Sequence, residues 1–341
     1  MSDNLHRPSA SQIGFVTAVF AALAAYPLVA GSYGLDLVAK IMIFAIFALS
    51  LELLVGGTGL VCFGHAAFFG IGAYAAVLLS PEYDAANLLW LLPACVGAAA
   101  LYALAVGALS LRTKGVYFIM VTLAFAQMAY YVVHDTPLGG GTDGIYLNAK
   151  PAIPGVFELK GGVVMYGFAW VALLATFALL AVVSRSRFGR ALAGIRVNEQ
   201  RMRATGFATY PYKLAAFTLS GAIAGLAGFL YAVKDGYVNP ELMSWHLSGS
   251  VLIMVILGGI GHLRGALIGA FAYVLLQEFF KSEALFGEFS KHWHLGMGLT
   301  IIASVALLPR GLVGIPAQLA ARLAGRASRR AEATPGLKEP R

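Results

Sequence analysis

Long apolar runs alternate with short polar stretches along most of the 341 residues. Several runs approach or exceed the roughly 20 residues that an α-helix needs to cross a bilayer core of about 30 Å. The pattern therefore predicts an all-α, polytopic integral membrane protein with about ten transmembrane helices, some of them short or broken at glycines. The expected spans cover residues 13–30, 35–55, 60–79, 88–111, 116–134, 163–184, 214–233, 249–261, 266–280 and 294–308.

Composition supports a membrane protein, because 59% of residues are hydrophobic and 12% are charged. The net charge of +8 comes from basic residues in the loops beside apolar runs, so the lipid bilayer is the expected partner and nucleic acid is not. Cys62 and Cys95 lie inside apolar stretches, and no metal site or catalytic residue is expected. Residues 7–31 resemble a signal peptide, but the length of the apolar run favours an uncleaved first span.

The charge distribution predicts the orientation of the chain. Residues 184–213 contain seven basic residues and one acidic residue, Glu199, and such loops stay on the cytoplasmic side. The basic tail, 309–341, shares that side if a hairpin turning at residues 262–264 divides 249–280 into two spans. A single span would put Arg264 near mid-bilayer, at a cost of about 2.5–3.5 kcal/mol. We therefore expect a membrane domain at 13–308, an external loop at 135–162, and a cytoplasmic tail and N-terminus, 1–12.

Glycine-rich segments suggest two kinds of role within the spans. Small residues allow helices to pack closely, and they also permit unwound backbone beside a transport path. A weak echo between residues 56–74 and 258–273 is compatible with duplicated halves. The resulting candidates for the substrate path are Gly56, Gly57, Gly59, His65, Gly258 and Gly259.

Ionisable residues inside the spans have a simpler interpretation. A lone His65 is expected to be a hydrogen-bonded packing residue, with contact to the transport path as the alternative. Lys40 and Glu52 are expected to anchor the second span by snorkelling or, for Glu52, through a partner at the cytoplasmic end.

The basic loop itself predicts two short helices. Phe188, Ala191, Leu192 and Ile195 recur at helical spacing and form one apolar stripe. Asn198 is a suitable cap for a second helical segment that stops near Gly206. A helix lying flat on the lipid headgroups would have the same pattern.

Several sequence blocks together resemble the permeases of ABC importers for branched-chain amino acids. The resemblance extends over about residues 35–315, and it is closer to the LivM-type subunit than to its LivH-type partner. The blocks lie at residues 59–74, 114–118, 142–144, 187–192, 195–196, 198–199, 206, 212–217, 220–228 and 254–259.

The resemblance implies a set of partners in the bacterial inner membrane. These are a second, LivH-like permease subunit, two cytoplasmic ATPase subunits that bind ATP and Mg, and an extracytoplasmic solute-binding protein. The chain lacks the G-x-x-x-x-G-K-[ST] motif that cradles nucleotide phosphates. We therefore expect a transport subunit without enzymatic activity or a cofactor of its own.

The resemblance also implies that the basic loop is the coupling helix that contacts the ATPase. Arg201 and Met202 stand where small residues are common in such loops. A urea or amide importer and, further away, an ion-coupled secondary transporter are the alternatives; the latter would need intramembrane charges, of which the spans have few. The expected coupling residues are Phe188, Arg190, Leu192, Ile195, Arg196, Asn198, Glu199 and Gly206.

Overall fold

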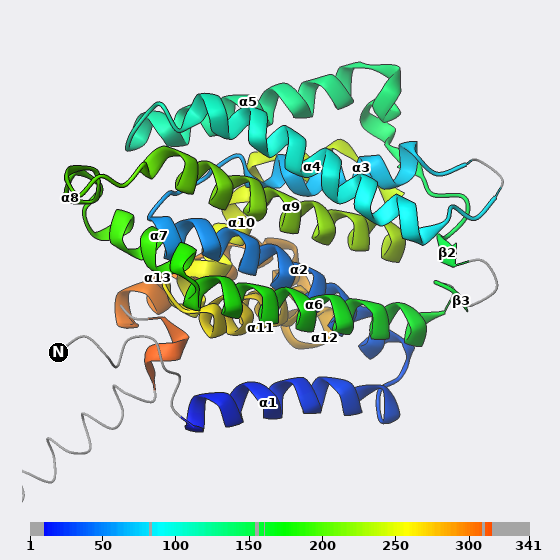
Figure 1. The fold of residues 1–341 in the computed structure, drawn as a ribbon. Helices are drawn as coiled ribbons and strands as arrows, with labels where there is room; N and C mark the ends of the chain where they lie inside the picture. The colour runs from blue at the N-terminus through cyan, green and yellow to red at the C-terminus, as the bar shows by residue number, and fades with distance from the viewer. Residues whose placement is uncertain (1–9, 82–83, 154–156, 160, 309–310, 316–341) are drawn as a thin grey trace, which may run out of the picture.

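The computed structural model describes residues 10–81, 84–153, 157–159, 161–308 and 311–315 (Figure 1). Most of these residues are helical, which confirms the all-α membrane fold. Among the described residues, six helices are long and apolar enough to cross a bilayer. The ten helices at the predicted spans are α1 (Ala10–Ala25), α2 (Ser32–Thr58), α3 (His65–Leu78), α4 (Leu88–Ser110), α5 (Val116–Asp135), α6 (Gly162–Arg185), α9 (Thr209–Asp235), α10 (Trp245–Gly258), α11 (Leu263–Lys281) and α13 (Trp293–Leu307).

Two of the predicted spans differ from the structure. A continuous helix over residues 60–79 is wrong, because Gly59 adopts φ 75° and ends α2, and residues 59–64 are not helical. Only α3, 14 residues long, completes that span. The span predicted from residue 249 begins earlier, since the Ser244 side chain accepts a hydrogen bond from the backbone N–H of Leu247 and starts α10 at Trp245.

The remaining elements are small. Helices α7 (Arg187–Val197) and α8 (Glu199–Ala204) follow α6, and α12 (Glu283–Phe286) follows α11. Strand β1 (Ile145–Tyr146) pairs antiparallel with β4 (Tyr237–Val238), and β2 (Ala152–Ile153) pairs antiparallel with β3 (Phe157–Glu158). Short 3-10 turns include η5 (Pro240–Met243), which leads into α10.

Helices α2 and α9 form the centre of the bundle. Most of the apolar window of each is buried, whereas a third or less is buried in the other four long spans. Close approach depends on glycine: a Cβ on Gly72 of α3 would collide with the backbone of Gly225 in α9, and one on Gly228 would collide with the Phe69 carbonyl. The predicted close packing of small residues is thus confirmed.

The loops gather at two opposite ends of the bundle (Figure 1). At one end lie α7, α8, the 111–115 loop with Arg112 and Lys114, and the α10–α11 turn, which Arg264 follows in α11; we call it the basic end. The strands lie at the other end, where Lys234 forms ion pairs with Asp36 and Asp235 at 2.9 and 2.7 Å. The predicted hairpin is present, but its turn lies at residues 259–262 instead of 262–264, because α11 already begins at Leu263.

Helix α1 packs along α6 at the edge of the bundle. The Tyr166 hydroxyl donates to the Leu23 carbonyl at 2.6 Å, and the Trp170 indole donates to the Phe20 carbonyl at 3.2 Å. The first nine residues and most of the basic tail lie outside the described residues, so the division into cytoplasmic and external segments stays a prediction.

Candidate coupling site at the basic end

Helix α7 has the amphipathic form that the sequence predicted. Its N-terminus is capped by Ser186, whose hydroxyl accepts from the Gly189 N–H at 3.2 Å. Leu192 and Ile195 are buried, and the Phe188 ring stacks on Tyr212 with ring centres 5.7 Å apart. The apolar side contacts α2, α6 and α9 of the same chain. It therefore faces the bundle rather than lipid headgroups.

Helix α8 begins and ends close to the predicted residues. The Asn198 side chain accepts from the Arg201 N–H at 2.9 Å, as a helix cap does. The helix ends at Ala204, and Gly206 follows with φ 85°. Both short helices are thus confirmed, while their contact with an ATPase stays a prediction.

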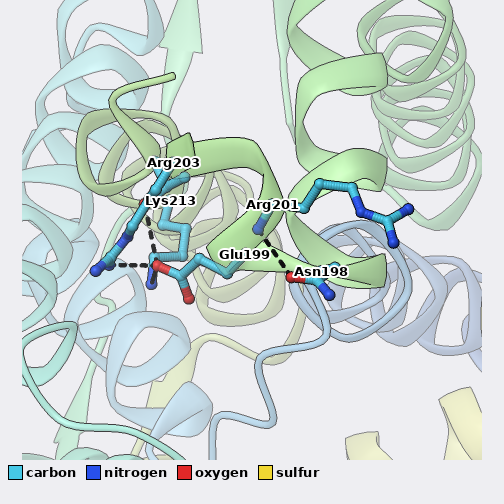
Figure 2. A network of polar contacts seen from close by, with 6 residues as sticks. Asn198, Glu199, Arg201, Arg203 and Lys213 are labelled. Atoms are coloured by element: carbon cyan, nitrogen blue, oxygen red, sulfur yellow. Dashed lines mark hydrogen bonds and ion pairs between the residues drawn. The ribbon is translucent and has the colours of Figure 1, made fainter. Parts of the chain in front are cut away.

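One carboxylate fastens α8 to α9. Glu199 Oε1 accepts from Arg203 Nη2 at 2.5 Å and from Lys213 Nζ at 2.9 Å (Figure 2). It also accepts from the Thr209 hydroxyl at 3.0 Å. Arg203 Nε also donates to Thr209, at 3.0 Å. We call Glu199, Arg203, Thr209 and Lys213 the Glu199 hub.

The hub places its charges in a partly buried position. The side chain of Lys213 is 5% exposed and that of Glu199 is 24% exposed. Burial by itself would raise the pKa of Glu199, but the hydrogen bonds and charge of Lys213, with those of Thr209 and Arg203, outweigh it and lower the pKa below its ordinary value. Glu199 is therefore ionised at neutral pH and holds α8 against the start of α9.

A second group of residues joins α7 to the ends of three membrane helices. Arg196, in the last turn of α7, donates from Nη1 to the carbonyl of Gly56 in α2 at 2.5 Å. Glu52, one turn earlier in α2, accepts from the N–H of Gly261 in the α10–α11 turn at 2.6 Å. A Cβ on Gly59 or Gly261 would lie 3.3 Å from the Arg196 side chain. We call Glu52, Gly56, Gly59, Arg196 and Gly261 the Arg196 junction.

Glu52 is buried, with a residue exposure of 3%. Snorkelling is therefore wrong for this side chain, and the alternative of a partner at the same end is right. One of its carboxylate oxygens accepts from the Gly261 N–H at 2.6 Å, and the other has no hydrogen-bond partner among the described residues. A buried carboxyl group depends on such a contact, because no water replaces a hydrogen bond that is lost.

The glycines nominated for the substrate path lie in this region. Gly56, Gly57 and Gly59 form the end of α2, and Gly258 and Gly259 begin the α10–α11 turn. A Cβ on Gly258 would collide with the Gly265 carbonyl, so helix packing accounts for that glycine. Contact of these glycines with substrate stays a prediction.

His65 is fully buried at the N-terminus of α3. Its Nε2 lies 2.7 Å from the Ser50 hydroxyl, which donates to the Phe47 carbonyl at 2.6 Å, so Nε2 is assigned as the donor to Ser50. The imidazole also stacks on the Phe47 ring at 5.4 Å between centres. These contacts support the packing interpretation, and a role in transport stays a prediction.

Two further residues were missed by the sequence reasoning. Trp245 and His246 are exposed at the start of α10, where the nearby Ser248 hydroxyl accepts from the Ala66 N–H of α3 at 3.0 Å. With a rise of about 1.5 Å per residue, Trp245 lies about 20 Å from the basic end of α10. The signal was the dipeptide Trp-His directly before an apolar run.

The comparisons with known proteins agree with this architecture. The family of permease components of branched-chain amino acid transport systems matches residues 33–305. The chain belongs to this family. It is 30% identical to the high-affinity branched-chain amino acid transport system permease protein LivM of Escherichia coli strain K12, over 88% of this chain and 74% of that protein. LivM of Salmonella typhimurium strain LT2 is 29% identical over the same shares.

More distant similarity and structural comparison add little. The autoinducer 2 import system permease protein LsrC of Klebsiella pneumoniae is 31% identical over 39% of this chain and 37% of its own. No solved structure matches the chain. Family membership confirms the predicted resemblance and a multi-pass transport subunit that works with other subunits, and it favours branched-chain amino acid import over the amide and ion-coupled alternatives.

Proposed function

We propose that this permease couples ATP-driven movement to import of branched-chain amino acids through its α7–α8 loop. The observation that carries the proposal is the division of this loop into two sides. Its apolar side and the Glu199 hub hold it to the bundle, whereas Arg190, Val197 and Arg201 are exposed. A loop fixed to membrane helices on one side and free on the other can transmit the movement of a bound partner.

The partner on the free side is an ATPase subunit. Two such subunits bind ATP and Mg, a LivH-like second permease subunit completes the pore, and a solute-binding protein delivers the amino acid from outside. This assignment puts the basic end and both termini in the cytoplasm, in accord with the excess of Lys and Arg there. Differential contacts of the ATPase with the two states of the permease supply the energy for alternating access.

The wall of the substrate path includes Trp245 and His246. The exposed aromatic face of Trp245 suits an aliphatic side chain, and the imidazole of His246 suits a charged end group of the amino acid. His246 is exposed on the bundle, and an ionisable side chain in a membrane helix faces protein or water rather than lipid. In this proposal they face the pore formed with the second permease subunit.

The coupling proposal is tested by disulfide cross-linking in the assembled transporter. Val197 is 82% exposed at the end of α7, and a Val197→Cys variant should cross-link to cysteines scanned over the ATPase surface. Leu79→Cys, 41% exposed at the opposite end, is the matched control. A membrane-impermeant thiol reagent should label it when added from outside, and it should not cross-link to the ATPase. Labelling of Val197→Cys from outside, or failure of every ATPase position to cross-link, would contradict the proposal.

The path proposal is tested by transport kinetics. Trp245→Ala should raise the KM for import of leucine by about tenfold, the factor that follows from losing about 1.4 kcal/mol of binding. Trp90→Ala is the control, because Trp90 has the same 48% exposure but lies near the start of α4. Equal KM values for the two variants would remove Trp245 from the path.

A further inference from the structure

The Arg196 junction connects segments that are far apart in the sequence. Arg196 reaches the Gly56 carbonyl across 140 positions, and Glu52 reaches the Gly261 N–H across 209 positions. The two contacts share α2, since Glu52 and Gly56 are one turn apart on that helix. Movement of α7 therefore reaches both α2 and the α10–α11 turn at the same point.

We propose that Glu52 and Arg196 are positioning residues that join α7, α2 and the α10–α11 turn into one rigid unit during transport. This inference rests on the proposed coupling function and deepens it by naming the membrane helices to which the loop delivers its movement. The unit includes α10, whose other end carries Trp245 and His246. Displacement of the loop at the basic end thus moves the wall of the substrate path.

The burial of Glu52, in a junction where Arg196, Gly59 and Gly261 are exposed, explains how the junction resists shear. Glu52 is 3% exposed, so its separation from the Gly261 N–H would leave a carboxylate without water to replace the hydrogen bond. Close packing adds to this resistance. A Cβ on Gly59 or Gly261 would lie only 3.3 Å from the Arg196 side chain, so the backbone of both glycines lies close to that side chain. Sliding α7 past either turn would break both the polar contacts and the packing.

The chemistry of the two side chains sets different requirements. The guanidinium of Arg196 is needed to donate to Gly56 while lying against Gly261, and a lysine ammonium lacks that planar shape. Glu52 acts through an acceptor oxygen, which glutamine also has and alanine lacks. Glu52→Gln should therefore preserve much of the junction, whereas Glu52→Ala and Arg196→Gln should not.

The first test measures amino acid imported per ATP hydrolysed by the complete transporter in proteoliposomes. Glu52→Ala and Arg196→Gln should each lower this ratio by about tenfold, the factor expected for one hydrogen bond to a charged group. Glu52→Gln should lower the ratio by about twofold or less. Glu52→Ala combined with Arg196→Gln should lower the ratio no further than the stronger single variant does, because the two residues act as a unit. Glu288→Gln, which removes a charge that is 91% exposed and lies outside the basic loop, should keep the ratio.

A second measurement does not depend on those variants folding. Spin labels at Val197→Cys and Ile260→Cys, both exposed in α7 and in the α10–α11 turn, should keep their distance when ATP is added to the complex. A distance that changes by several ångströms between the two states would overturn the rigid unit, as would a normal import ratio in assembled Glu52→Ala and Arg196→Gln transporters. Val197 cross-links to the ATPase test the coupling function separately, so the two failures are distinguishable.

Discussion

The Glu199 hub and the Arg196 junction both fasten the α7–α8 loop to the membrane helices, but they do so in different ways. In the hub, one carboxylate oxygen takes three side-chain donors from residues 4, 10 and 14 positions away. In the junction, two polar contacts link residues 140 and 209 positions apart, and both use backbone groups. The hub is a local staple, and the junction is a long-range joint.

The two carboxylates differ in how far they are exposed and in what compensates them. Glu199 is partly exposed, so its negative charge is balanced by a lysine and an arginine and still meets water. Glu52 is buried, and one of its oxygens accepts from the backbone N–H of Gly261. Disturbing the junction should therefore cost more than disturbing the hub.

Two glycine substitutions give the largest expected contrast. Gly261 has φ 91° and Arg196 lies against it, so Gly261→Ala should lower the free energy of unfolding by about 3 kcal/mol through backbone strain and displacement of that side chain. Gly206 has φ 85° with open space around it, so Gly206→Ala should cost only about 1 kcal/mol. Denaturant unfolding of the chain in detergent measures both. Equal losses of unfolding free energy in the two variants would mean that the contact with Arg196 contributes nothing beyond backbone strain.

Replacing Lys213 should have the next largest effect. Lys213→Met keeps most of the buried stem and removes the ammonium that Glu199 accepts, so we expect a loss of about 2 kcal/mol from the attachment of α8. Trypsin cleavage after Arg201 and Arg203 should become faster in the native protein, whereas Lys213→Arg should stay close to wild type. Unchanged cleavage of Lys213→Met would show that the hub does not hold the loop.

Acid should release the hub by a smaller amount. Because the folded-state pKa of Glu199 is below its ordinary value, the stabilisation is present above the unfolded pKa of about 4.3 and is lost as pH falls through the lower, folded pKa. A spin label on exposed Gln200→Cys, in lipid nanodiscs, should become more mobile only below about pH 4.3. In Glu199→Gln the same label should be mobile at pH 7 and show no such transition.

The smallest effect is expected for Arg203. Its side chain is 50% exposed and pairs with Glu199 at i and i+4, so Arg203→Gln should cost about 0.3–0.5 kcal/mol. Added salt should weaken this pair in the wild type and leave the Glu52–Gly261 contact unaffected. If Arg203→Gln destabilised the attachment of α8 as much as Lys213→Met does, side-chain exposure would not explain how much each donor contributes.

Much of this fold was predictable because its signals are local. Apolar runs predicted ten helices, the spacing of Phe188, Leu192 and Ile195 predicted α7, and Asn198 predicted the start of α8. The hub uses the same short sequence range, although the sequence did not identify Lys213 as the partner of Glu199. The spacing of apolar residues identifies a helix and its apolar face, but it does not say which element of the fold packs against that face.

The sequence by itself determined the membrane class and most helices through composition and periodicity, the α10–α11 hairpin through the distribution of charge, and the two helices of the basic loop through periodicity and the Asn198 cap. Tertiary structure alone decided that α3 is preceded by unwound backbone, that Glu52 is buried instead of snorkelling, and that both glycine turns meet at Arg196. Those outcomes depend on contacts between chain segments over a hundred positions apart. In lipid, shape and hydrogen bonding select such contacts, and neither leaves a periodic trace along the chain.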